Sequence, residues 1–458
     1  MNGQILFTVY LLIALIITAY LTKKSKTEYR LITFIMIFWI FAGSLLSQDQ
    51  YIFKIKGLFF ELQADRIILL IFTIYYIILW SSHRKQNINE EKTINPLFEK
   101  FLLLFLILYL FSNIMHLRDV LTIKDLIASY TRLFSFPIIY LIIKKTVDEG
   151  MVKSLITALL IVCIISSFVG IYQFLVDPEF FRYGSGFLAF TGKVRANGIF
   201  RAEYVQGCYL ISGLAVVLTI LKNKVIKFTL FTLFLLAIIF TFHRASWIIT
   251  LTVLFLYIFK IIRLKIWQFI FVSPVFITFI LLLMKFSPSF FTNLEDKPVV
   301  TEGIMRDTVT GRFALYNMAF SEIPKYLLFG VGSSKSEIYY HSVMRAIGSE
   351  DVAMGLQGGI HNLYIQTAFF FGLPTAIIFT IFIILIVLYF WKKAIPENKT
   401  YFIPLAMIMA FMMINLSNMF YLYTEYGLLL AIFLGMFIGL KQPDAAKILN
   451  GIGFKENN

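Results

Sequence analysis

Four arginines stand where apolar runs meet polar loops, and they are the side chains best suited to chemistry in this chain. They are found in the stretches GKVRANGIFRAEY, TFHRASW and TGRFALYNMAF, as Arg195, Arg201, Arg244 and Arg312. One arginine at the end of an apolar helix commonly extends to lipid headgroups. Four such planar, permanently charged groups on one side of a membrane can instead pair with phosphate oxygens. The group therefore predicts a site for a lipid-linked diphosphate.

His361 is the candidate general base. It follows Gly358-Gly359 and precedes a long apolar run. At a helix start, the positive end of the helix dipole and neighbouring arginines favour the neutral imidazole, which can accept a proton at ordinary pH. A capping or interfacial role accounts for such a histidine equally well. We expect His83 and His243 to be structural.

Several other kinds of chemistry are disfavoured. The stretch GVGSSKS, which starts at Gly330, lacks the glycine and the preceding strand of a nucleotide-binding loop. The predicted outer loops have no Asp-x-Asp and no metal-like group of carboxylates, so neither a metal nor another cofactor is expected. Cys163 and Cys208 fall inside predicted helices and are interpreted as packing residues.

The composition is that of a membrane protein. Hydrophobic residues make up 59% of the chain and charged residues 15%. A bilayer core of about 30 Å needs roughly 20 helical residues, and apolar runs of that order recur along the sequence. We predict an all-α, polytopic transmembrane bundle of about 12–13 helices. They lie at about 4–20, 31–47, 65–80, 100–115, 127–143, 153–175, 203–221, 227–242, 245–260, 266–286, 361–390, 401–418 and 424–440.

Lysine and arginine recur in alternate connections, which the positive-inside rule places in the cytoplasm. The opposite connections then face outward, and they include 176–202, 242–244 and 286–360. The four arginines and His361 consequently share the outer face. The predicted parts are N-terminal transmembrane helices at 1–285, a large external loop with short helices at 286–360, C-terminal helices at 361–440 and a cytoplasmic tail at 441–458. The net charge of +15 is a topology signal, and the expected partner is the lipid bilayer, with no nucleic acid.

Two groups of motifs carry a family resemblance. TGRFALYNMAFSEIPKYLLFGVG is followed by His361-Asn362, nine residues, Gly372 and Thr375. This pattern resembles the shared core of the bacterial O-antigen polymerase and O-antigen ligase superfamily. Its structural motif residues here are Gly311, Gly330, Gly332, Asn362, Gly372 and Thr375.

The second group precedes the large loop. Arg195-Ala-Asn-Gly-Ile-Phe is similar to the family's Arg-x-x-Gly-x-Phe, and Arg244 matches the arginine of its Ser-Arg-x-x motif, with His243 in place of serine. The family often continues with Asn-Pro-Asn, whereas this chain has Arg201-Ala-Glu203-Tyr, which leaves the roles of Arg201 and Glu203 open. The resemblance covers about 190–390.

The resemblance implies a metal-independent glycosyltransferase with an undecaprenyl-diphosphate-linked glycan as donor. Its scaffold would be similar to the lipid-dependent glycosyltransferases, and its active site would lie on the outer face of the bacterial cytoplasmic membrane. His361 would take the proton of an acceptor hydroxyl, while Arg312, Arg244, Arg195 and Arg201 would stabilise the diphosphate.

Three functions compete. The first is a polymerase that joins lipid-linked oligosaccharide repeats into O-antigen, capsule or exopolysaccharide, with a chain-length regulator and a flippase as candidate partners. The second is a ligase that transfers finished glycan to a lipid or protein acceptor. The third is a transporter or flippase, which ranks last because polar residues gather on one face and do not line a path through the midplane.

Overall fold

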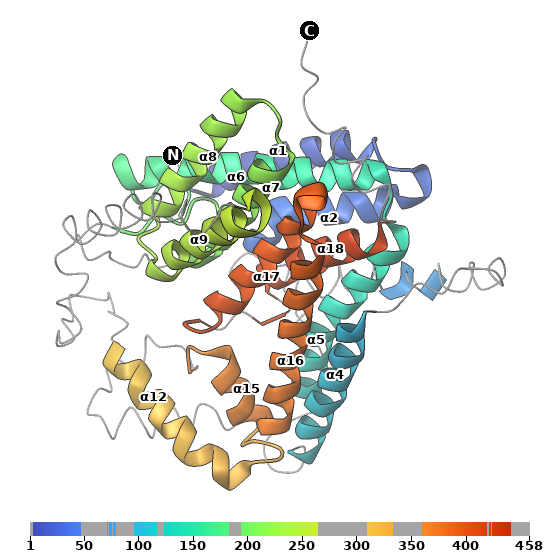
Figure 1. Ribbon diagram of the computed structural model, residues 1–458, viewed down its shortest axis with the longest axis vertical. Helices are drawn as coiled ribbons and strands as arrows, with labels where there is room; N and C mark the ends of the chain where they lie inside the picture. Colours follow the sequence, from blue (N-terminus) through green and yellow to red (C-terminus); the bar gives the residue numbers. More distant parts are fainter. Residues whose placement is uncertain are drawn as a thin grey trace.

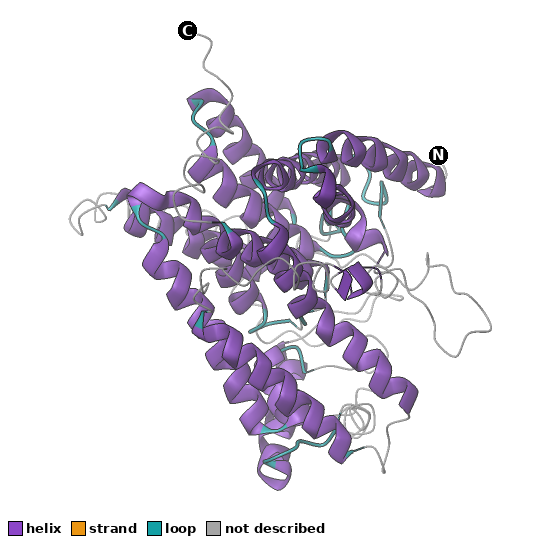
Figure 2. Ribbon diagram, turned by 90° about the vertical axis from the view of Figure 1, so that its right-hand side faces the viewer, coloured by secondary structure: helices purple, strands orange, loops and turns teal. Residues whose placement is uncertain are grey.

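The computed structural model describes residues 3–46, 71, 73–75, 77–78, 96–116, 123–182, 194–263, 309–332, 360–418, 421–422 and 424–440. The regular elements in these ranges are helices (Figure 2). The all-α prediction is therefore confirmed. The predicted helices at 65–80 and 266–286, most of the loop at 286–360 and the tail at 441–458 lie mainly or wholly outside these ranges.

The helix bounds follow the apolar runs closely. The helices are α1 (Gly3–Thr22), α2 (Arg30–Leu46), α4 (Leu97–Met115), α5 (Ile123–Thr146), α6 (Glu149–Leu175), α7 (Glu203–Ile220), α8 (Lys224–Phe240), α9 (Arg244–Tyr257), α12 (Val309–Glu322), α15 (Leu363–Phe371), α16 (Leu373–Lys393), α17 (Phe402–Ile414) and α18 (Glu425–Gly439). Within the described ranges, five helices are long and apolar enough to cross a membrane, and shorter apolar helices accompany them. The chain is a polytopic helical membrane protein.

The core lies where α7, α17 and α18 meet. α18 packs along α5, α16 packs along α4, and α17 contacts both α7 and α9 (Figure 1). Nearly every side chain of α7 is buried. Small residues allow this close packing, since a Cβ at Gly213 would lie 2.8 Å from Sγ of Cys163. Cys163 and Cys208 are both buried free thiols, in keeping with a packing role.

The contacts group the loops as the charge pattern predicts. Oδ2 of Asp148, before α6, accepts hydrogen bonds of 3.0 Å from the Ser25 hydroxyl and the Lys26 amide, after α1. Lys144 at the end of α5 forms a 2.7 Å ion pair with Glu99 at the start of α4. These connections were all predicted to lie on one side of the membrane, and the contacts bring Asp148 to the α1–α2 connection and Lys144 to the start of α4.

One predicted helix is in fact two. The run at 361–390 was expected to form a single helix, but α15 ends at Phe371 and α16 begins at Leu373. Between them Gly372 has a φ of 87°, and a Cβ at this position would lie 2.1 Å from the carbonyl oxygen of Leu328. The Leu373 amide donates a 2.9 Å hydrogen bond to the Leu327 carbonyl. The approach of this other backbone bends the chain at Gly372.

Candidate active site

The loop that carries Arg195 is fixed by a buried glutamine of α6. Oε1 of Gln173 accepts from the amides of Asn197 (3.0 Å) and Gly198 (2.8 Å). Gly198 has a φ of 58°, and a Cβ there would lie 2.1 Å from the Ser166 hydroxyl oxygen. Only glycine fits this turn without strain. Gly198, the glycine of Arg-x-x-Gly-x-Phe, thus allows the loop backbone to approach α6 closely.

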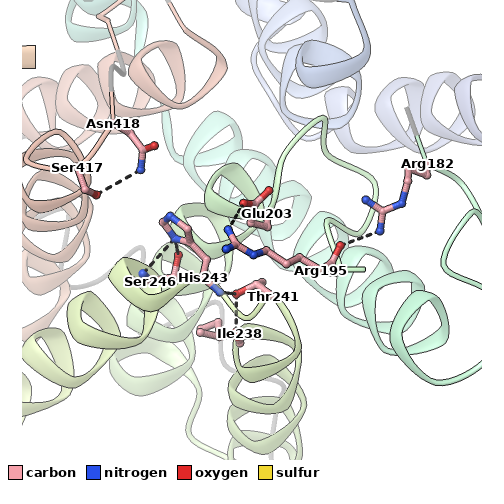
Figure 3. Close-up of polar contacts among 9 residues, drawn as sticks. All are labelled: Arg182, Arg195, Glu203, Ile238, Thr241, His243, Ser246, Ser417 and Asn418. Atoms are coloured by element: carbon pink, nitrogen blue, oxygen red, sulfur yellow. Dashed lines mark hydrogen bonds and ion pairs between the residues drawn. The ribbon is translucent and has the colours of Figure 1, made fainter. Parts of the chain in front are cut away.

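The side chain of Arg195 is held by Glu203, the first residue of α7. Nη1 of Arg195 lies 3.0 Å from Oε1 of Glu203 (Figure 3), and the side chains are 30% and 8% exposed. Nε of Arg195 is buried and has no hydrogen-bond partner in the described part of the chain. Leaving a buried donor unpaired costs about 1–3 kcal/mol. An oxygen of a bound anion would remove that cost.

Arg244 is the second arginine of this site. The positive charge of Arg195 acts on it, so the two guanidinium groups lie within electrostatic range of each other. Arg244 opens α9 directly after His243, whose Nδ1 accepts a 3.2 Å hydrogen bond from the Ser246 amide and caps the helix (Figure 3). A Cβ at Gly207 would lie 2.1 Å from the Ser246 hydroxyl oxygen, so the first turns of α7 and α9 are closely packed.

Arg201 forms an ion pair with a carboxylate of α18. Its Nε lies 2.8 Å from Oε1 of Glu425, which is 1% exposed at the start of α18. Tyr204 lies within electrostatic range of both residues and of Glu203. The ion pair connects the arginine-bearing loop to α18. A role for Arg201 in binding a diphosphate stays a prediction.

His361 precedes Asn362, the N-cap residue of α15, and has a φ of 54°. Asn362 caps the helix by accepting from the amides of Tyr364 (3.0 Å) and Ile365 (3.1 Å). The Asn362 amide group also donates a 3.2 Å hydrogen bond to the Leu416 carbonyl. The start of α15 is therefore fastened to the turn that follows α17.

That turn lies at the same end of the bundle as Arg244. The rings of Tyr257 and Phe402 pack with centroids 5.3 Å apart, so the last residue of α9 meets the first residue of α17. The two helices are antiparallel neighbours of similar length, which brings the start of α9 to the end of α17. Figure 3 draws Ser417 and Asn418 in the same view as His243. His361 and the paired arginines thus occupy one end of the bundle.

Arg312 lies in α12, one helical turn before Tyr316. Gly311 lies in the same helix, and the side chain of Arg312 is outside the described residues. The Tyr316 hydroxyl donates a 3.4 Å hydrogen bond to the His361 carbonyl, which brings α12 against the start of α15.

The glycine motif after α12, with Gly330 and Gly332, forms backbone hydrogen bonds to the last residues of α15, next to the bend between α15 and α16. The Val331 amide donates to the Phe369 carbonyl (2.9 Å), and the Gly332 amide donates to the Phe370 carbonyl (3.1 Å). Gly330 has a φ of 68°, and a Cβ there would lie 2.3 Å from the carbonyl carbon of Phe370. The Thr375 hydroxyl donates to the Phe371 carbonyl at 2.8 Å. These contacts give the motif a positioning role.

Two residues of the site were not found from the sequence. Nη2 of Arg182 donates a 2.7 Å hydrogen bond to the Arg195 carbonyl (Figure 3). Burial lowers the pKa of Arg182, while the charges of Glu179 and Glu203 raise it. Glu425, the partner of Arg201, is the other. The available signal for Arg182 was its place in the same outer loop as Arg195, whereas Glu425 is more than two hundred positions away.

Part of the chain matches the model of a known protein family. Residues 229–380 match a family model described as O-antigen ligase. The matched part contains Arg244, Arg312, His361 and Gly372, and it begins after the loop that carries Arg195. No characterised protein gives a significant match to the chain. Among the described residues, no three His, Cys, Asp or Glu side chains form a group that could hold a metal ion.

Proposed function

We propose that this integral membrane protein, a member of the O-antigen polymerase and ligase superfamily, is a polymerase that joins undecaprenyl-diphosphate-linked oligosaccharide repeats into a surface polysaccharide. The family match supports a glycosyltransferase-like enzyme that acts on lipid-linked glycans. The observation that carries the donor assignment is Arg195, whose buried Nε has no partner in the described part and whose neighbour is Arg244.

The two arginines would bind the diphosphate of the donor. As the bond between the anomeric carbon and the diphosphate oxygen breaks, negative charge grows on that oxygen. Preorganised donors in a site of low dielectric stabilise such charge, and removing one typically costs about two to three orders of magnitude in rate. Arg201 and Arg312 would add positive charge to the same region.

His361 would act as the general base. The acceptor hydroxyl oxygen attacks the anomeric carbon, its proton passes to the imidazole, and undecaprenyl diphosphate leaves. Positioned general bases typically contribute about two to four orders of magnitude. The contact of Tyr316 with the His361 backbone supports this assignment, because it brings α12 over the histidine and would limit access of water to the donor.

The site would face the periplasm or the cell exterior. Support comes from the alternation of basic loops and from the contacts that group those loops, such as Asp148 with Ser25. The chemistry would need no metal ion or other cofactor. A flippase and a chain-length regulator are the partners we propose, because the repeats must first cross the membrane and the polymer must then be limited in length.

A ligase is the second candidate, favoured by the description of the matched family. Deletion of the gene in its host separates the two. Loss of a polymerase leaves single repeat units on the final carrier, because ligation of unpolymerised units continues. If long polymer accumulates on undecaprenyl diphosphate and none reaches the final acceptor, the protein is the ligase. Complementation with His361→Ala should reproduce the deletion in either case.

A further inference from the structure

We infer that Glu203 and Arg182 are positioning residues that hold Arg195 ready for the donor diphosphate, Glu203 through the side chain and Arg182 through the backbone. The inference rests on the proposed function and adds two residues to it. Neither residue is expected to touch the reacting atoms.

Glu203 holds one specific nitrogen of Arg195. Its carboxylate contacts Nη1 at 3.0 Å. Nε, which with Nη2 forms the opposite edge, is buried and has no hydrogen-bond partner in the described part of the chain. This edge presents two parallel N–H groups, the geometry that pairs bidentately with phosphate. Glu203 therefore holds Nη1 and leaves Nε without a hydrogen-bond partner in the described part of the chain.

Glu203 is itself rigidly placed. It is the first residue of α7, where the helix dipole stabilises a carboxylate. Its side chain is only 8% exposed, so it has little room to move. Breaking a buried pair by removing one partner is commonly costly, because the other charge stays behind in a poorly solvated place. The pair should persist when the ligand binds.

Arg182 holds the backbone of Arg195. Its Nη2 donates to the Arg195 carbonyl and its Nε donates to the Pro178 carbonyl, each at 2.7 Å. One planar guanidinium thus joins the turn after α6 to the loop that carries Arg195. A lysine ammonium is a single point of charge and cannot reproduce both contacts in that geometry.

The sign of one mutational effect tests the role of Glu203. If charge alone mattered, Glu203→Gln would make the site more positive and tighten anion binding. If Glu203 positions Arg195, the same change should weaken binding, because the guanidinium loses its fixed plane. Glu179→Gln is the matched control, since Glu179 also acts on Arg182 by its charge but is exposed and lies outside the contacts of Arg195.

The measurement is binding of undecaprenyl diphosphate to the purified full-length protein in nanodiscs, followed by tryptophan fluorescence. We expect Glu203→Gln to weaken binding about tenfold, which corresponds to roughly 1.4 kcal/mol. Glu179→Gln should bind as tightly as the parent protein or slightly more tightly. Unchanged or tighter binding by Glu203→Gln overturns the positioning role.

Arg195→Ala separates this inference from the proposed function. If Arg195→Ala binds the probe normally, the proposed diphosphate site is wrong and the positioning role falls with it. If Arg195→Ala binds weakly while Glu203→Gln binds normally, the site stands and only the positioning role is lost.

Should Glu203→Gln give too little folded protein, Arg182→Lys takes its place. It keeps the charge but loses one of the two backbone contacts. In a polymerisation assay, we expect a KM for donor raised by about threefold or more with kcat largely retained, since the reacting groups are untouched. An unchanged KM for Arg182→Lys overturns the role of Arg182.

Discussion

The hydroxyl oxygen of Tyr316 lies 3.4 Å from the carbonyl oxygen of His361, so α12 meets α15 at the residue proposed as the general base. This contact joins the large outer segment to the C-terminal helices. Arg312 lies one turn before Tyr316 on the same helix. The helix that carries Arg312 therefore contacts the backbone of the proposed base.

Replacement of the base should abolish polymer formation. We expect His361→Ala and His361→Gln to lower kcat by about two to four orders of magnitude, because neither side chain can accept the proton. Both proteins should be present in the membrane at normal abundance. Polymer length on gels and immunodetection of the protein check the two parts, and full activity of either variant removes His361 from the mechanism.

Arg312 should tolerate no replacement. We expect Arg312→Ala to abolish polymer formation and Arg312→Lys to fail as well, because an ammonium group does not form the paired contact of a guanidinium with phosphate. Lys325→Ala is a suitable control, because Lys325 is an exposed cation of the same segment that pairs with Glu322. Normal polymer from Arg312→Lys would show that charge alone is enough.

Gly372→Ala should destabilise the protein by about 1–3 kcal/mol or more. The cost comes from a backbone conformation that L-residues rarely adopt and from the overlap of the new methyl group with the Leu328 carbonyl. Thermal unfolding in detergent measures it. In the control Gly43→Ala the three nearest atoms belong to the Trp39 ring, at 2.9–3.1 Å, and Gly43 is not among the glycines with a positive φ, so a smaller loss is expected.

Impermeant thiol reagents should distinguish the two sides of the membrane. In a background of Cys163→Ser and Cys208→Ser, a cysteine at Ser334 should be labelled in intact cells, and one at Asn398 should be protected until the cells are opened. The alternation of basic loops is the reason for this expectation. The reversed labelling pattern would contradict both the topology and the side on which the active site is placed.

Activity of the purified protein should persist in excess EDTA. The proposed mechanism uses arginines to neutralise the leaving diphosphate, so no divalent ion is needed. Turnover of lipid-linked donor before and after chelation is the measurement. A loss of activity that Mg²⁺ or Mn²⁺ restores would argue for metal-assisted chemistry.

Local patterns in the sequence were enough to predict most of the helices and to group Arg195 with Arg244. Apolar length predicted α6 and α7 within a few residues. The bend at Gly372 was missed, although Pro374 at the start of α16 is a typical helix-start signal. Hydropathy could not predict this break, because the run is apolar on both sides of it. The bend depends on contact with the backbone of Leu327 and Leu328, which hydropathy does not describe.

The pairing of Arg201 with Glu425 could not be predicted for a different reason. Local spacing carries no information about contacts between residues so far apart in the sequence. Both charges stand beside apolar helix starts, where either could have faced solvent or lipid headgroups. Only the packing of α18 against the core brings the buried carboxylate to the loop.

The bend at Gly372 also determines where His361, the proposed base, lies along the length of α16. Because the chain reverses there, Tyr364 of α15 packs on Phe379 of α16, with ring centroids 6.0 Å apart. Phe379 lies six residues, or about 9 Å, along α16 from its start. With α16 across the bilayer, as its length and apolar composition allow, His361 would lie below the rim of the helices. On the proposed function, a sugar attached directly to a membrane-embedded carrier would be held at that depth, whereas free oligosaccharides would be poor donors even without a specific contact to reject them.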